Sequence, residues 1–299
     1  MMKNLFSLLL LLTALNGIAQ KTALPKTDIY LLPLTINKTN IQVGNGVKIT
    51  TWQGYNNQPS FSPDGKTILY TSVQADSQAD IYAYNIKAKT TKQLIYVKGK
   101  KEYSAIYMPK GKNISAVQVQ EDDSTQYLAQ FSKDGEYKKL IFPTISPVGY
   151  YCWANDTTAA LFVLGKPETL QLANINTEKT TIVAKNIGRC IQRIPNTPAI
   201  SFVDKTDSNK WMIKSYAPAI KQFFVIGPTL PKCEDYCWTA AGIILMGNEG
   251  KLFVFNPATD RKWVQVGDFS KTDYANFYRL SVSRDGKYLA VVSYEGKKP

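Results

Sequence analysis

The chemistry open to this chain is limited by the complete absence of histidine from its 299 residues. A Ser-His-Asp triad, a Cys-His pair and a histidine-ligated zinc or copper site all need an imidazole, so these classes are excluded. Lys and Arg number 36 against 23 Asp and Glu, which gives a formal net charge of +13. The residues best suited to bind a ligand are therefore cations, which form charge-assisted hydrogen bonds to anions, and tyrosines, which offer flat stacking faces.

Aromatic and cationic residues recur close to the start of a repeated sequence unit. A ring of such units would bring these residues together, although they are far apart along the chain. We therefore predict a concave mouth, built from inter-blade loops, that binds an anionic or carbohydrate-like ligand or a peptide. Substitution of such exposed loop residues should barely change stability. The predicted binding residues are Lys101, Tyr103, Tyr151, Arg189, Arg193, Tyr236 and Arg279.

The repeated unit consists of short strands and tight turns. Residues 59–66 read Pro-Ser-Phe-Ser-Pro-Asp-Gly-Lys and are followed by an apolar alternation over 67–71. Pro presets one turn dihedral and Gly accepts a positive φ, so this stretch predicts two strands joined by a turn. Strand-like runs at 79–84 and 90–95 complete a four-stranded unit, and its first half returns at 281–291.

Weaker copies of the unit lie between these two and define a period. Each has a bulky residue before its first turn, and these residues are spaced by 41 to 46 positions. A period in the forties with four strands per unit is typical of a β-propeller, and six units fit the chain length whereas seven do not. Two copies share Tyr-Cys-Trp, at 151–153 and 236–238, whose tryptophans we expect to pack between blades.

The two ends of the chain complement each other. The last copy contains only two strands, and runs resembling a third and a fourth strand stand at 27–34 and 47–52. We therefore predict an all-β, six-bladed propeller with four antiparallel strands per blade, in which N-terminal strands close the last blade.

Residues 1–19 have the layout of a secretory signal peptide. Lys3 precedes an apolar run over 5–15, and small residues at 17 and 19 form a cleavage site. The apolar run is too short to span a bilayer. We predict a single domain over 20–299, exported to the periplasm or outside the cell and acting as a monomer.

The four cysteines are Cys152, Cys190, Cys233 and Cys237. They are too few for a disulfide scaffold and lack zinc-ribbon spacing, so buried thiols are the main interpretation. One disulfide is the alternative. Cys190 and Cys233 fall before the first strands of neighbouring units, so Cys190–Cys233, or the local Cys233–Cys237, is the pair expected if one forms.

The Ser-Pro-Asp-Gly-Lys turn at 62–66, its degenerate copy at 283–287, and Asp-Ile-Tyr at both 28–30 and 80–82 resemble the repeats of TolB-type, WD-like propellers. The resemblance runs from about residue 28 to the end of the chain. It implies an exported binding propeller. TolB has an α/β domain before its propeller, and we expect none here.

Two function classes remain open. We favour a non-catalytic binding or scaffold propeller without metal or cofactor, whose partner is an envelope protein or an acidic or carbohydrate ligand rather than nucleic acid. The alternative is a lactonase-type hydrolase, which would hold a divalent metal with carboxylates and amides. The residues roughly placed for that metal are Glu102, Asn186, Glu234, Asp235 and Asn276. Lyases that resemble TolB-type propellers use histidine–metal sites, which this chain cannot form.

Overall fold

The computed structural model describes residues 24–37 and 40–296, which form strands, turns and loops without any α-helix. These residues therefore include no helix that could cross a membrane. The predicted signal peptide lies outside the described residues.

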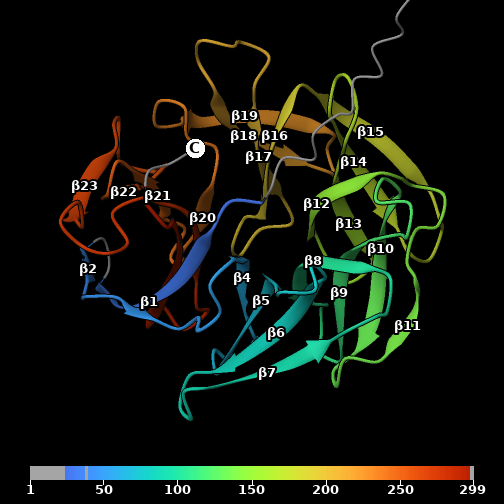
Figure 1. Cartoon of the computed structure of the whole chain (residues 1–299). Coiled ribbons are helices and arrows are strands. Elements are labelled where there is room, and N and C mark those ends of the chain that lie inside the picture. The colour runs from blue at the N-terminus through green and yellow to red at the C-terminus, as the bar shows by residue number, and fades with distance from the viewer. Residues whose placement is uncertain (1–23, 38–39, 297–299) are drawn as a thin grey trace, which may run out of the picture.

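Four separate antiparallel sheets contain four strands each, paired in chain order. Figure 1 shows the sheets arranged around a common centre, with β8, β12 and β20 near it and β11, β15, β19 and β23 at the periphery. The first sheet contains β8 Lys101–Tyr107, β9 Asn113–Val119, β10 Gln126–Ser132 and β11 Tyr137–Leu140. The second contains β12 Val148–Trp153, β13 Thr158–Val163, β14 Thr169–Asn174 and β15 Thr180–Lys185. The third contains β16 Ile187–Arg193, β17 Ile200–Asp204, β18 Met212–Ala217 and β19 Gln222–Pro228, and the fourth β20 Tyr236–Trp238, β21 Ile244–Asn248, β22 Lys251–Phe255 and β23 Val264–Asp268.

The remaining nine strands are connected in one sheet that contains both ends of the described chain. One half is a four-stranded unit of β4 Tyr55–Phe61, β5 Thr67–Val73, β6 Ala79–Asn85 and β7 Thr90–Ile95. The other half contains β24 Phe277–Val282, β25 Tyr288–Tyr294, β1 Thr27–Asn37, β2 Asn40–Val43 and β3 Val47–Lys48. The halves meet at a single parallel residue pair, Thr27 with Tyr55.

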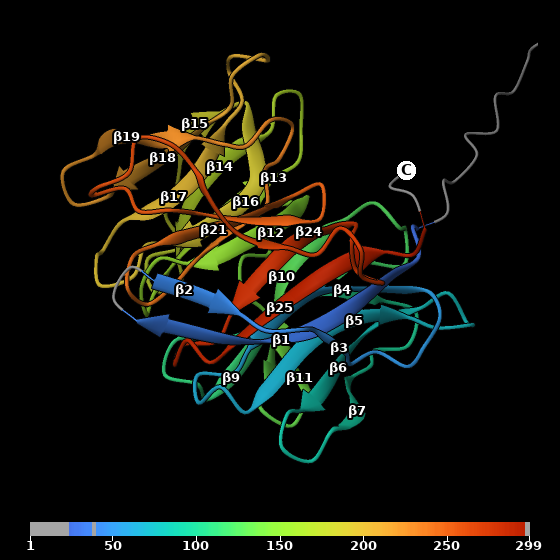
Figure 2. The same ribbon diagram turned by 90° about the vertical axis from the view of Figure 1, so that its left-hand side faces the viewer.

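The pairing of β1 with β25 joins the two ends of the chain, as the sequence predicts. The antiparallel register runs from Thr27 opposite Tyr294 to Pro33 opposite Tyr288, and Figure 2 shows β1 and β25 side by side. Because these strands lie at opposite ends of the sequence, this sheet depends on a contact that local structure cannot form.

The predicted fourth strand over 47–52 is wrong in its length. Only Val47–Lys48 pairs with β1, and β2 pairs with the end of β1 instead. Backbone bonding continues one residue further, where the N–H of Ile49 donates to the carbonyl of Ile29 (2.9 Å), and the N–H of Ile29 then donates to the hydroxyl of Thr50 (3.2 Å) instead of to a carbonyl. The same hydroxyl donates to Asp28 (2.7 Å), which also accepts from Lys48. Side chains therefore hold this segment where backbone pairing ends.

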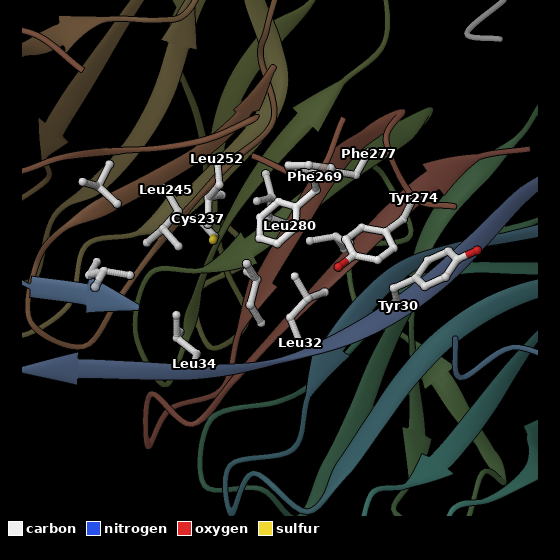
Figure 3. Close-up of a cluster of buried hydrophobic side chains, with 14 of the residues drawn as sticks. Tyr30, Leu32, Leu34, Cys237, Leu245, Leu252, Phe269, Tyr274, Phe277 and Leu280 are labelled. Carbon is white, nitrogen blue, oxygen red and sulfur yellow. The ribbon is translucent and has the colours of Figure 1, made fainter. Parts of the chain in front are cut away.

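The inner face of β1 packs against the sheet of β20–β23. Tyr30, Leu32 and Leu34 point into a buried cluster with Leu245 and Leu252, completed by aromatic residues that precede or begin β24 (Figure 3). Each of these side chains is at most 9 % exposed. The N-terminal strand thus supplies part of the core between two neighbouring sheets.

The Tyr-Cys-Trp triplets act as clamps between neighbouring sheets. Ser115 of β9 accepts hydrogen bonds from the hydroxyl of Tyr151 and the indole of Trp153, both at 2.9 Å. Ser201 of β17 accepts equivalent bonds from Tyr236 (2.7 Å) and Trp238 (2.9 Å) in the next sheet. The two copies of the Tyr-Cys-Trp triplet therefore make the same kind of contact between neighbouring sheets.

We predict that Ser115→Ala and Ser201→Ala each lower the free energy of unfolding by about 1–3 kcal/mol, because each removes the acceptor of a tryptophan indole, and Ser201→Ala also that of the Tyr236 hydroxyl, whereas the Tyr151 hydroxyl keeps the backbone carbonyl of residue 115 (2.6 Å). Urea unfolding measures the change, and Ser208→Ala, at an exposed loop position, is the matched control. Equal midpoints for all three variants and the parent would contradict the clamp.

Candidate binding site at the channel mouth

The innermost strands begin earlier than the sequence indicates. Residues expected in inter-blade loops lie instead within β4, β8, β12, β16 and β24, or at the start of β20. Most of these strands contain register irregularities, such as those between Asn57 and Ser60 and between Phe277 and Arg279. A bulge leaves a residue unpaired and re-aims its neighbours. Some of the predicted loop residues, such as Arg189 and Arg279, therefore lie at the centre of the molecule rather than on exposed loops.

Arg279 of β24 connects strands from across that centre. Its guanidinium donates to Asn57 Oδ1 of β4 (2.8 Å) and to Asp235 Oδ1 beside β20 (3.4 Å). It also lies over the ring of Tyr150 from β12, 5.3 Å from the centroid, and near that of Tyr278. Only 13 % of its side chain is exposed. Arg279 is therefore a structural crosslink, and the expectation that it lies on an exposed loop is wrong.

A row of alternating charges continues outward from Arg279. Asp235 also accepts from the guanidinium of Arg189, whose Nη1 lies 3.5 Å from Glu234. Glu234 in turn lies 3.4 Å from Lys205. A Cβ at residue 188 would lie 2.6 Å from the carboxylate of Glu234. The glycine at this position therefore leaves the room that the carboxylate occupies.

The arginines keep the central carboxylate ionised despite its burial. Burial works to raise the pKa of Asp235, but Arg279 and Arg189 outweigh it and hold this pKa below its ordinary value. Asp235 likewise holds the pKa of Arg279 well above its usual range against the effect of burial. The charges of this network compensate one another. Removal of one of them would leave an opposite charge buried without a counter-charge in a surrounding of low dielectric constant.

A groove of about 840 Å³ opens near this network. It lies beside Tyr150, which also borders a smaller hollow of about 390 Å³ next to Arg189. Tyr55 and Tyr103 meet edge to face in the groove at 6.4 Å between centroids, and Trp52 is 38 % exposed. Besides several glutamines and aliphatic residues, the lining includes Trp52, Tyr55, Tyr103, Tyr150, Lys26, Lys101 and Asp123.

The seven predicted binding residues divide into two groups. Lys101 and Tyr103 lie in the groove, and Arg189 and Arg279 lie at the centre beside it. Lys101 forms an ion pair with Asp123.

The other three residues are placed differently from what an exposed loop implies. Tyr151 and Tyr236 border the central hollow but are 7 % and 1 % exposed, and their hydroxyls serve the inter-sheet clamps. Arg193 is exposed at the far end of β16, next to the turn that leads to β17. Successive residues of a strand point to opposite faces, so the Tyr150 hydroxyl reaches Arg279 and that of its neighbour Tyr151 reaches Ser115.

Several site residues were not singled out from the sequence, above all Trp52, Tyr55, Asn57, Tyr150 and Tyr278. Their signal was present, because they stand directly before or within the first strands of the repeat. What was missing was the alternation phase that decides which of two neighbouring residues faces inward.

Cys190 is a thiol in this structure, as the main interpretation of the sequence has it, rather than half of the alternative disulfide with Cys233. Its sulfur accepts from the backbone N–H of Tyr236 at 3.4 Å. Cys152, Cys190 and Cys237 are all buried, and burial raises the pKa of each thiol, to about 12 for Cys190. These cysteines are packed as apolar groups.

Three of the carboxylates and amides considered for a metal already have other partners. Asp235 and Glu234 are ion-paired with cations, and Asn276 donates to the carbonyl of Gly296 (2.5 Å). Within residues 24–37 and 40–296, no group of three or more Cys, Asp or Glu side chains is placed to hold a metal ion.

Glu102 is fully buried in the second position of β8, where β4 has Asn56. The Asn56 amide donates to the carbonyls of Thr27 (3.0 Å) and Trp52 (2.8 Å). Glu102 accepts from Gln118 at 3.0 Å through Oε1, and its Oε2 has no hydrogen-bond partner among the described atoms. Burial is the main cause that raises the pKa of Glu102 to about 7.

No protein-family model matches the chain, and no curated protein matches it. Several solved structures are similar to it in fold. A putative TolB from Agrobacterium tumefaciens superposes with a TM-score of 0.65 at 13 % identity, covering 91 % of this chain and 99 % of that one. TolB from Acinetobacter baumannii gives 0.58 at 11 % identity, covering 91 % of this chain and 65 % of that one. An oligogalacturonate lyase from Vibrio parahaemolyticus gives 0.57 at 13 % identity, covering 85 % and 83 %.

These similarities concern the fold alone. The chain has a TolB-like, propeller-type fold of four-stranded antiparallel sheets. Proteins described as TolB and as a lyase share it, so the fold does not distinguish binding from catalysis.

We predict that Arg279→Ala lowers the free energy of unfolding by about 3–5 kcal/mol, because it leaves Asp235 buried with one counter-charge fewer. Adding Asp235→Asn should restore part of the loss by removing the uncompensated charge. Urea unfolding compares both with Arg284→Ala, at an exposed turn position. An unchanged midpoint for Arg279→Ala would reject the crosslink.

We also predict that Glu102 makes the protein less stable as pH rises. The folded state holds its proton up to about pH 7, whereas the unfolded chain releases it near pH 4.3. The folded form therefore binds more protons between these values, and stability falls across that window.

Glu102→Gln should abolish this component and raise the free energy of unfolding at pH 8 by up to about 3 kcal/mol. Its amide is neutral at every pH, so no charge has to be buried. Urea unfolding from pH 4 to 8 provides the test, with the exposed Glu136→Gln as the control. The same pH slope in Glu102→Gln and the parent would show that the pKa of this carboxyl does not differ between the folded and the unfolded chain.

Proposed function

We propose that the chain is an exported, non-catalytic six-bladed propeller, acting as a monomer, that binds an acidic carbohydrate chain in the groove at the channel mouth. The observation that carries this proposal is the aromatic and cationic lining of the 840 Å³ groove. The six-blade count rests on the four separate sheets and on the single residue pair that divides the nine-stranded one.

The composition of the groove favours a sugar chain with acidic groups. Trp52, Tyr55 and Tyr103 offer flat surfaces against which sugar rings stack, and the glutamine amides can both donate and accept hydrogen bonds. Lys26 is exposed at the groove and can pair with a carboxylate. The net charge of +13 adds long-range attraction for a polyanion.

Binding without catalysis is favoured by the way the central charges are used. Asp235 and Glu234 are neutralised by Arg189, Arg279 and Lys205. An ionised carboxylate committed to two arginines is a poor general base or metal ligand. A lactonase-type hydrolase would need these groups to turn away from their cations.

The test is isothermal titration of the protein with oligogalacturonate, an acidic sugar chain, and with neutral cello-oligosaccharide of equal length. We expect oligogalacturonate to bind more tightly, and Trp52→Ala and Tyr103→Ala each to weaken binding by about tenfold, which corresponds to about 1.4 kcal/mol. The matched control is Tyr137→Ala on β11, which is exposed but outside the groove.

Three results would overturn the proposal. Equal affinity in Trp52→Ala and the parent would exclude the groove, and tighter binding of a glutamate-rich peptide than of oligogalacturonate would assign the groove to a protein ligand. Breakdown of oligogalacturonate together with specific stabilisation by Ca²⁺ or Mn²⁺ would establish the enzyme alternative.

A further inference from the structure

The outermost strand β19, Gln222–Pro228, has one free edge. It pairs with β18 on one side, and no other strand of the described chain pairs with it on the other. Figure 1 shows β19 at the outer side of its sheet. Alternate backbone N–H and C=O groups of such a strand point outward, where they can accept a further strand.

The side chains of β19 differ from those of the other outer strands. Phe223, Phe224 and Val225 are 45 %, 50 % and 64 % exposed, and the strand contains no charged residue. Four comparable strands each carry a charge that discourages pairing with another chain. These charges are Lys92 in β7, Lys138 and Lys139 in β11, Lys185 in β15 and Asp268 in β23.

One of the exposed aromatic residues is held in place by its neighbours. Phe223 packs on Tyr216 of β18 (4.8 Å between ring centroids) and on Phe202 of β17 (6.1 Å, edge to face). Phe224 follows it on the opposite face of the strand. Both faces of one free edge therefore present an apolar side chain, and an added strand could pack on either.

The charge around β19 specifies the kind of strand that would pair there. Between Asp207 and Glu234 the chain contains Lys210, Lys214, Lys221 and Lys232 and no acidic residue. Lys221, immediately before β19, and Lys232, shortly after it, are exposed. A second copy of the chain would bring the same lysines and a further net charge of +13. An acidic strand would be attracted to the edge.

We propose that β19 is a docking edge for a partner protein, which adds an extended segment of alternating apolar and acidic residues as a fifth strand of this sheet. Backbone hydrogen bonds along the edge supply the pairing. The apolar side chains of the segment cover Phe223, Phe224 and Val225, and its acidic residues face the flanking lysines. This edge is separate from the groove and does not depend on the carbohydrate proposal.

The test uses a synthetic peptide of alternating valine and glutamate, and as its control the same peptide with lysine in place of glutamate. We expect the glutamate peptide to bind, measured by fluorescence anisotropy, and to slow amide hydrogen exchange over residues 222–226. Phe224→Glu should weaken binding at least about tenfold, because it removes an apolar contact and places a negative charge against the glutamates of the peptide. Ile182→Glu, at an exposed position of the outer strand β15, should bind as the parent does.

Other results would overturn the proposal. These are the absence of binding and of protection at the highest soluble peptide concentration, protection of the groove instead of β19, or equal affinity in Phe224→Glu and the parent. A dimer in analytical ultracentrifugation that Phe224→Glu abolishes would assign the edge to a second copy of the chain. Oligogalacturonate binding should be unchanged in Phe224→Glu, so failure of this proposal is distinguishable from failure of the carbohydrate proposal.

Discussion

The buried contact between Arg279 and Asp235 is the constraint on which the arrangement of the inner strands depends. Taking a guanidinium and a carboxylate out of water is costly unless both are fully hydrogen-bonded. Here that requires Asn57, Tyr150 and Arg189 to reach the same point from three other strands. The register irregularities of β4, β16 and β24 occur beside these residues, which indicates that the strands deviate from regular pairing in order to meet.

A second constraint acts between neighbouring sheets. A single sheet of this size cannot bury both of its faces, so each depends on its neighbours. Buried clusters link the sheets, and each Tyr-Cys-Trp triplet adds two hydrogen bonds to one serine. The pairing of β1 with β25 imposes the same dependence on the ends of the chain. The centre is thus held both by its own ion network and by contacts around it.

The sequence predicts the all-β fold, the repeat, the joining of the two ends and the face that carries the groove, because turns and apolar alternation are local signals. It does not predict which residues face inward. Tyr150 and Tyr151 are chemically alike, and only the strand register, shifted between Val148 and Tyr150, directs the first to Arg279 and the second to Ser115. Arg193 was misplaced for a related reason, since β16 extends through 193 and carries this residue away from the mouth.

The rigid centre also determines where ligands can act. Because Arg279, Arg189 and Asp235 satisfy one another, a ligand that entered between them would have to replace several charge-assisted hydrogen bonds with its own. The groove beside Tyr150 imposes no such cost, since its tyrosines and Trp52 are already partly exposed. The free edge of β19 is likewise open without rearrangement. Basic residues that are not needed to balance buried carboxylates, such as Lys26 and Lys221, lie beside these two surfaces. The excess positive charge of the chain therefore attracts acidic partners to surfaces that they can occupy without disturbing the core.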